Sequence, residues 1–255
     1  MKKIKIVLVL FILLITISGC SGNMSKEDAY NAYLSAMQKT ATIKNLYAKM
    51  EANLATPIAY DQKVSILGDF WIKTNQDPNL AELRLDFFGV IPNAPTSEIH
   101  LYIKDGIAFM DDGYRKTIGG SLFGMDPESL GTMATDTVFS DSLLTYFNCK
   151  GKKVGNEIKV TFTIKKELLK LLNDEAERTM PGAKVVKLEI VALIGEDGYI
   201  KTYDMILRFT MMNSGVPLSI DVSLIISLEE LADTFEIEFP DFSEYQYIEG
   251  VLPEE

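Results

Sequence analysis

The sequence is poor in the side chains from which most catalytic and metal sites are built. Its 255 residues include one histidine, His100, and two cysteines, Cys20 and Cys149. One histidine excludes metal sites made of several histidines and argues against a histidine-based catalytic triad. A Gly-rich phosphate loop, a nucleophile elbow and a cysteine pair with metal-ligand spacing are also missing. The composition therefore favours a protein that is not an enzyme and that uses no cofactor and no metal.

Positive charge is the second shortage. The chain has 25 basic and 36 acidic residues, which gives a formal net charge of −11. Three of the lysines lie within residues 1–19, so a chain without that segment has a net charge of −14. So acidic a surface is repelled by nucleic acid and by anionic lipid headgroups. We therefore expect no nucleic-acid partner.

Paired carboxylates occur, but none has a spacing that selects a site. Asp111-Asp112 precedes Gly113, a pattern typical of a hairpin turn, with a cation site as the alternative. The three carboxylates within residues 174–177 fall on a charged helix face that water solvates. Sequence gives no reason to choose any two carboxylates for hydrolysis, so an unrecognised enzyme is the least favoured interpretation.

The first twenty residues have the layout of an export signal. Lys2, Lys3 and Lys5 precede an apolar run, 6–17, that only Thr16 interrupts. The run is shorter than the roughly 20 apolar residues that span a bilayer comfortably. A segment of this kind is removed after export and takes no part in the fold.

The residues that follow the run, Ile17-Ser18-Gly19-Cys20, resemble the bacterial lipobox. The resemblance implies that residues 1–19 are a lipoprotein signal peptide and that Cys20 receives diacylglycerol and becomes the amino terminus. Residues 20–24 then form a lipidated tether to the membrane, on its extracytoplasmic face, with a Gram-positive cell surface favoured. Two acyl chains suffice for stable anchoring. An ordinary signal peptide with a chance cysteine is the alternative.

Cys149 is the only thiol left once Cys20 carries lipid, so no disulfide can form within the chain. The core must then be stabilised by burial of apolar side chains, which a chain of this length can achieve. Cys149 follows an apolar stretch predicted to be helical. A buried, inert thiol is the favoured interpretation and a reactive thiol is the alternative.

Apolar periodicity divides the rest of the chain into a few helices and many strands. Helical spacing after a capping pattern at Ser25 predicts a helix over 25–43, and further helices are expected over 135–147 and 165–179. Turn signals such as Lys104-Asp105-Gly106 separate the alternating segments. Alternation predicts strands over 46–54, 64–72, 83–87, 99–103, 107–110, 157–164, 186–194, 199–211, 218–226 and 235–239.

These elements define an α+β fold built on one large curved antiparallel β-sheet. We expect a single domain over 25–242, followed by an acidic, solvated tail over 243–255. A sheet of about ten strands curls, and its apolar face needs covering. The few helices are the only cover available, so we expect them on the concave face. His100 falls on the face opposite its aliphatic neighbours and is expected at the surface.

Three segments resemble a known family. The helix 25–43 leading into 46–50, the hairpin 102–110 and the ending 237–242 are similar to the outer-membrane lipoprotein carrier fold (LolA/LolB) and to LppX-like surface lipoproteins. The resemblance implies a half-barrel whose concave face, lidded by helices, holds acyl chains. The carriers use an arginine to regulate their cavity, and Arg84 lies on a predicted strand of this sequence.

Two functions remain after these exclusions. The first is the binding of a lipid or another hydrophobic ligand in the half-barrel cavity, because small and flexible residues are mixed among the larger apolar ones. The second is an envelope protein–protein interaction module, in which the same residues form a packed core without a ligand. The hypothetical cavity residues are Met50, Ala52, Val64, Ile66, Phe70, Met205, Leu207 and Phe209.

Overall fold

A computed structural model describes residues 22–55, 63–73, 81–91, 95–119, 143–179, 181–213, 216–232 and 235–247. Its helices are α2 (Lys26–Ala41), α4 (Leu143–Tyr146), α5 (Lys166–Thr179) and the 3₁₀ helix η3 (Phe242–Glu244). Its strands are β1 (Asn23–Met24), β2 (Asn45–Ala55), β3 (Lys63–Lys73), β4 (Glu82–Val90), β5 (Ser97–Lys104), β6 (Ile107–Asp111), β7 (Lys116–Ile118), β8 (Phe147–Val154), β9 (Glu157–Ile164), β10 (Lys184–Ile194), β11 (Ile200–Asn213), β12 (Val216–Ala232) and β13 (Gln246–Tyr247).

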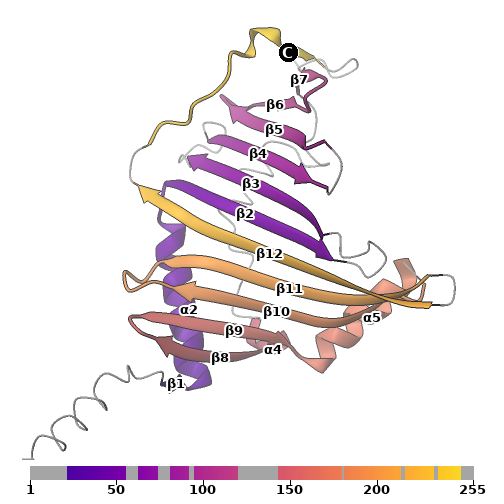
Figure 1. The fold of residues 1–255 in the computed structure, drawn as a ribbon. Coiled ribbons are helices and arrows are strands. Elements are labelled where there is room, and N and C mark those ends of the chain that lie inside the picture. Colours follow the sequence, from indigo (N-terminus) through magenta and orange to yellow (C-terminus); the bar gives the residue numbers. More distant parts are fainter. Residues whose placement is uncertain are drawn as a thin grey trace, which may run out of the picture.

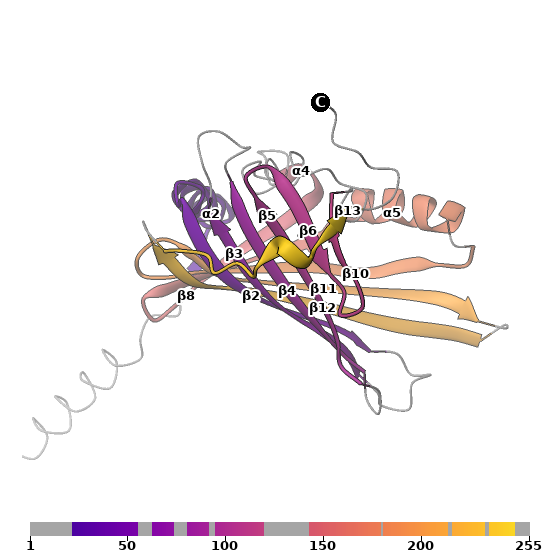
Figure 2. The ribbon, with the colours of Figure 1, turned by 90° about the horizontal axis from the view of Figure 1, so that it is seen from above.

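The described strands form one open sheet in the order β1-β8-β9-β10-β11-β12-β2-β3-β4-β5-β6-β7-β13 (Figure 1). Every neighbouring pair is antiparallel except β13 with β7. The prediction of a large antiparallel sheet is therefore confirmed. In Figure 2 the direction of β2–β6 differs clearly from that of β10–β12, as the accumulated twist of a large sheet requires.

Two meanders build this sheet, one from β2 to β7 and one from β8 to β12. Their junction is the pairing of β12 with β2, along which Val222 lies opposite Leu54 and Leu228 opposite Ala48. Local turn chemistry sets the hairpins inside each meander. At the β5–β6 turn, Asp105 and Gly106 both have positive φ, 52° and 72°, which a two-residue turn between twisted strands requires.

Helix α2 packs on one end of the apolar sheet face. Ser25 caps the helix, because its hydroxyl accepts a hydrogen bond from the Asp28 backbone N–H at 3.0 Å. Tyr33 is buried against Phe162 of β9, with ring centroids 4.8 Å apart. Leu168 of α5 packs against the same core cluster. In Figure 2 the described helices α2, α4 and α5 lie on the same side of the sheet.

The helices cover only part of that face. The principal contacts of α2 are with β1 and β8–β11, and those of α5 are with β10. The expectation that helices cover the concave face is therefore not confirmed, because the contacts of α2 and α5 are concentrated at the β8–β11 end. Over β12, β2 and β3, most of the described apolar side chains are partly exposed, although Ala48, Leu218 and Ile220 are buried.

The middle of the chain differs from the sequence expectation. Most of the helix expected over 135–147 lies outside the described residues, and its end is the short helix α4. Phe147 then begins β8, a strand that the sequence analysis missed. Phe147, Cys149 and Gly151 alternate as buried residues along it, but three lysines and a glycine obscure the apolar pattern.

The carboxyl-terminal segment also differs. Residues 235–239 form no strand, although their apolar residues alternate. The segment crosses the side of the sheet that has no helix (Figure 2) and stacks Phe242 on Phe109, with centroids 3.8 Å apart. Tyr245 is buried and β13 pairs with β7. Residues 243–247, the first part of the expected tail, therefore lie against the sheet, and 248–255 lie outside the described residues.

Candidate functional site

The strand register brings the predicted cavity residues onto one face of the sheet. Across β11, β12, β2 and β3, partners in successive strands share a face. One such row contains Met205, Leu224, Ala52 and Ile66. The rows beside it place Met50, Val64, Phe70, Leu207 and Phe209 on the same face. This is also the face on which α2 packs, and we call its part on β11, β12, β2 and β3 the open apolar face.

The eight predicted cavity residues are not part of the buried core. None of them is fully buried, and Ile66 is 42% exposed. Its neighbour in the next row, Leu54, is 38% exposed. By contrast, Phe162, Val160 and Ala192 at the α2 end of the same face are almost completely buried. Among the described residues, one end of the face is core and the other is accessible apolar surface.

β12 supplies side chains that the sequence analysis left out of the site. Ile220, Val222, Leu224 and Ile226 run down the centre of the open apolar face. Their alternation was visible in the sequence. What the sequence did not reveal is that β12 pairs with β2, because the two strands come from opposite ends of the chain.

A glycine shapes the middle of the open apolar face. A Cβ at Gly68 would lie 3.0 Å from Cε2 of Phe70 and 3.4 Å from Cε of Met50. The absent side chain leaves room for Phe70, whose ring meets Phe87 of β4 edge-on at 5.5 Å. Any side chain at position 68 would displace these apolar groups.

A tyrosine pair marks the border between the packed and the open parts. Tyr203 lies in register with Ala192 on one side and Ile226 on the other. Its hydroxyl shares a hydrogen bond with that of Tyr33. Burial raises the pKa of Tyr203 to about 12, and it also raises the pKa of Tyr33. Both phenols stay neutral at physiological pH and bring no charge to the apolar face.

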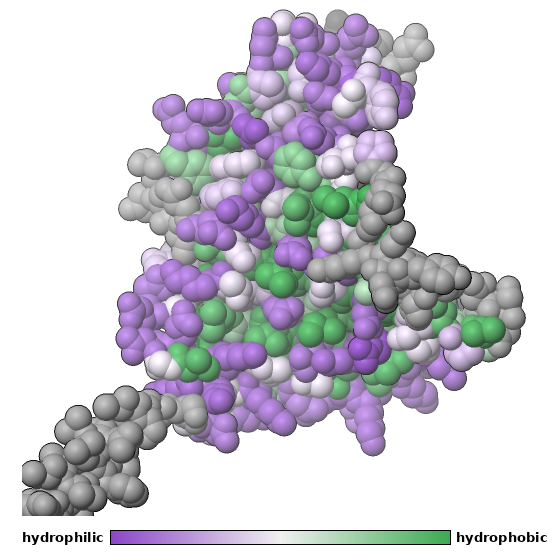
Figure 3. Space-filling view, in the orientation of Figure 1, coloured by the Kyte–Doolittle hydropathy of each residue, from purple (hydrophilic) through white to green (hydrophobic). Residues whose placement is uncertain are grey.

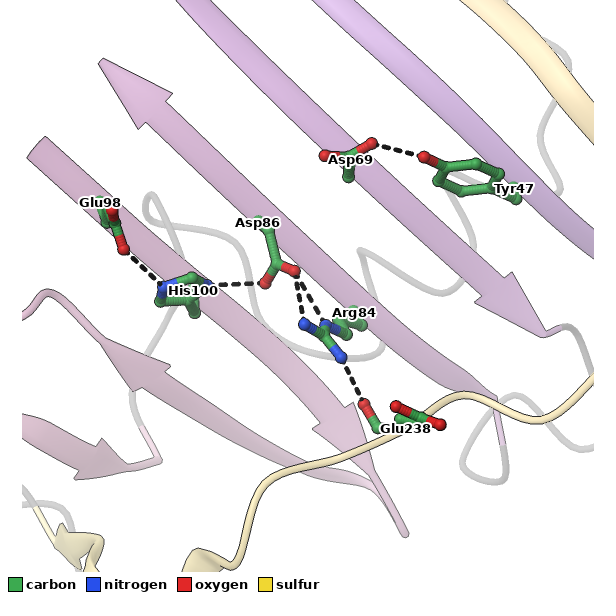
Figure 4. A network of polar contacts seen from close by, with 7 residues as sticks. All are labelled: Tyr47, Asp69, Arg84, Asp86, Glu98, His100 and Glu238. Carbon is green, nitrogen blue, oxygen red and sulfur yellow. Dashed lines mark hydrogen bonds and ion pairs between the residues drawn. The ribbon is translucent and has the colours of Figure 1, made fainter. Parts of the chain in front are cut away.

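The opposite face carries a network of polar contacts around one buried carboxylate (Figure 4). Asp86, only 4% exposed, accepts a hydrogen bond from Arg84 Nε at 2.9 Å. Its other oxygen lies 2.7 Å from His100 Nδ1. Arg84 also donates to the Glu238 carbonyl at 2.8 Å. Arg84 thus binds the carboxyl-terminal segment and does not lie on the open apolar face, so the cavity role that the family resemblance suggested has no support here.

Figure 3 shows this face, which lies opposite α2, α4 and α5 and which we call the helix-free face. Apolar and hydrophilic side chains are mixed there over the middle strands. A hollow of about 370 Å³ lies there, lined by charged and apolar groups that include Lys49, Glu51 and Leu67. A second hollow, of about 730 Å³, lies beside the β6–β7 turn. Beside it, Asp111 and Asp112 accept hydrogen bonds from backbone N–H groups of that turn, as turn carboxylates do.

Cys149 is buried in the core cluster beneath α2. Burial raises the pKa of its thiol, which holds it in the unreactive neutral form. Cys20 lies outside the described residues. Within the described ranges, no cluster of three metal-ligating side chains occurs, and no helix has the length and apolar character needed to cross a membrane.

Comparison with known proteins finds only weak structural likenesses. No protein-family model matches the chain, and no curated protein matches it. Among solved structures, Rv2717c from M. tuberculosis is 11% identical, with 76% of this chain and 98% of that chain covered and a TM-score of 0.24. The LolA superfamily protein NE2245 from Nitrosomonas europaea is 10% identical, with 78% and 94% covered and a TM-score of 0.14. Scores this low carry no argument about function.

Proposed function

We propose that this chain is a non-enzymatic lipoprotein that binds a lipid or another hydrophobic ligand on the open apolar face. Cys20 carries the lipid anchor, and the folded domain stands on the extracytoplasmic side of the cell membrane. In this proposal the sheet acts as a half-barrel, with α2 closing one end of the ligand site. The observation that carries the proposal is the half-exposed apolar face on β11, β12, β2 and β3.

The chemistry of this face suits an acyl chain. Its rows consist of aliphatic, Met and Phe side chains together with Tyr203 and Gly68, and the charged strand neighbours, such as Glu51 and Asp69, point to the other side of the sheet. Acyl chains need apolar surface with few polar groups. Water on half-exposed leucine and isoleucine is unfavourable by about 25 cal/mol per Å² of apolar area, so a ligand that displaces it gains affinity.

Adjacent residues of β3 provide a matched test. Ile66 lies on the open apolar face and Leu67 on the helix-free face, and both are 42% exposed. With a soluble form that starts at Ser21, uptake of a fluorescent fatty acid should fall at least tenfold in Ile66→Glu, because a carboxylate in an acyl-chain site must be desolvated. Leu67→Glu adds the same charge to the same strand and should bind like the parent protein.

The outcomes separate the candidate functions. Copurified lipid in native mass spectra of the parent, absent from Ile66→Glu, supports ligand binding. No copurified lipid together with no fatty-acid uptake would contradict it and leave the envelope interaction module. Equal losses in Ile66→Glu and Leu67→Glu would show that the open apolar face is not the site.

The anchor is tested separately in cells. Radiolabelled palmitate should enter the protein, and Cys20→Ala should remove both the label and the attachment to the membrane fraction. Unlabelled parent protein, together with a Cys20→Ala form that stays in the membrane fraction, would contradict the lipoprotein assignment.

A further inference from the structure

The edge of the sheet nearest the proposed anchor is basic, although the chain as a whole is acidic. β8 contains three lysines, Lys150, Lys152 and Lys153, and no carboxylate. Lys159 of β9 lies opposite Lys152, and Lys26 begins α2 beside them. All five lysines are exposed. We call them the basic edge.

Few negative charges offset the basic edge. On the first turn of α2 and on β8 and β9, the carboxylates are Glu27, Asp28 and Glu157. Asp28 is hydrogen-bonded to Ser25, and Glu196 on the adjoining turn is held by Asn156. None of the five lysines forms an ion pair with another residue that the structure describes. Their charge therefore faces solvent in a chain whose formal net charge is −11.

The basic edge is also where the chain enters the fold. Asn23 pairs with Lys152 in the β1–β8 ladder, and the Lys153 N–H donates to the Gly22 carbonyl at 3.2 Å. Gly22 is two positions after Cys20, with Ser21 between them. At about 3.3–3.6 Å per residue, so short a segment holds the edge within roughly 10 Å of a lipid attached at Cys20. That distance is about one Debye length at physiological ionic strength.

We propose that the basic edge is a membrane-contact surface that binds anionic lipid headgroups. The inference rests on the anchored state in the proposed function, because the acidic body would keep an untethered chain away from the same headgroups. Once tethered, the lysines are attracted and the acidic remainder is repelled. The sheet then stands upright, with β8 at the bilayer. At about 4.8 Å per strand, β13 lies up to about 50–55 Å from β8 along the sheet.

Figures 1 and 3 show this arrangement from one side: β1 and β8 lie at the bottom of the ribbon, and hydrophilic side chains line that rim. In this orientation the end of the face that α2 covers is nearest the membrane, and the open apolar face on β11, β12, β2 and β3 lies beyond it.

Chemical tethering tests the orientation without relying on lipidation in cells. The chain from Cys20 onward is coupled through Cys20 to a maleimide lipid in vesicles, and single coupling is verified by mass because Cys149 is buried. Lysine acetylation is then followed residue by residue. On vesicles containing phosphatidylglycerol, the basic edge should react at least roughly threefold more slowly than on phosphatidylcholine vesicles. Half-molar salt should abolish the difference.

A matched pair of variants isolates the basic edge. In Lys150→Gln/Lys152→Gln/Lys159→Gln, the protection of the remaining Lys26 and Lys153 should be lost. In Lys166→Gln/Lys170→Gln/Lys184→Gln, which removes the same charge from exposed positions on α5 and β10, it should persist. Equal acetylation on the two kinds of vesicle, or equal losses in the two variants, would overturn the proposal. If acetylation shows no protection but palmitate labels Cys20 in cells, the membrane-contact surface is refuted and the lipid anchor is still supported.

Discussion

Asp86 holds together the polar network on the helix-free face. Its two oxygens pair with Arg84 and His100, and its side chain is almost completely buried. Removing one member of such a group leaves the remaining polar groups shielded from water and without a hydrogen-bond partner. We expect Asp86→Ala to lower the free energy of unfolding by about 2–3 kcal/mol, measured by urea denaturation at neutral pH.

Asp221→Ala is the control for Asp86→Ala, because it removes a carboxylate that also pairs with an arginine, in this case Arg208 on the adjacent strand. Asp221 and Arg208 are both well exposed to water. Surface pairs contribute little, since solvent screens them. Losses of similar size in the two variants would mean that burial does not set the importance of Asp86.

Cys149 provides a prediction about pH. Burial raises the pKa of its thiol above the ordinary 9.0, so the folded state binds a proton that the unfolded state releases. The stabilisation is complete below that ordinary pKa and is lost as pH rises toward the folded value. Stability should therefore decline above pH 9, and the decline should be smaller in Cys149→Ala.

The thiol itself can be followed with a chain that starts at Ser21, in which Cys149 is the only cysteine. At pH 8 its reaction with a disulfide reagent should be at least roughly a hundredfold slower in the folded protein than in guanidinium. A folded protein that reacts as fast as the unfolded chain would favour the reactive thiol instead.

At the scale of elements, the carboxyl-terminal segment is held by aromatic side chains. Phe242 stacks on Phe109 and meets Tyr102 and Tyr245. Phe242→Ala should release the segment, at a local cost of about 2–3 kcal/mol, without unfolding the rest of the sheet. Hydrogen exchange should then accelerate in residues 239–247 and in β7.

Tyr114→Ala is the matching control, because Tyr114 lies on the neighbouring β6–β7 turn with 95% of its surface exposed. It should leave exchange in the segment unchanged. Exchange that rises throughout the sheet in Phe242→Ala would show that the segment is part of the cooperative core and not a separately held element.

The elements that sequence predicted well are those that local chemistry determines. Ser25 caps α2, and Asp105-Gly106 forms the β5–β6 turn. In both cases the residues at the position itself determine the local structure. The segment 235–239 was wrongly predicted as a strand because alternation shows which side chains are apolar and not whether a neighbouring strand is available. β8 was missed because its apolar pattern is weak although its residues are buried. Gly151 is buried by the close approach of Ala29, and this contact joins parts of the chain that are far apart in the sequence.

At the scale of the whole molecule, the predicted cavity residues also show the difference between what local sequence determines and what distant contacts determine. Alternation put Ala52 and Met205 on apolar faces, but only the pairing of β12 with both strands makes the two faces one surface. Sequence could not supply this pairing, because closing so long a loop leaves no local trace. Nor could it show that α2 covers one end of the face and leaves the other half-exposed.

The central position of β12 leads to a prediction about cooperativity. Because β12 joins the two meanders, neither should unfold alone. Trp71, the only tryptophan, reports on the β2–β7 meander, and the Cys149 thiol reports on the β8–β12 meander. Their urea transitions should coincide, as two-state unfolding requires.

Ile225→Pro tests the junction directly. Ile225 pairs with Asp204 on one side and Glu51 on the other, so proline removes a ladder hydrogen bond at the centre of the sheet, at a cost of about 3 kcal/mol or more. The urea midpoints reported by Trp71 and by the Cys149 thiol should both fall, and by the same amount. Val216→Pro, at the first residue of the same strand, should shift neither by much, because proline is tolerated there. If Ile225→Pro moved the Cys149 transition and left that of Trp71 in place, the meanders would be independent units, and a ligand on the open apolar face would bridge two bodies instead of resting on one.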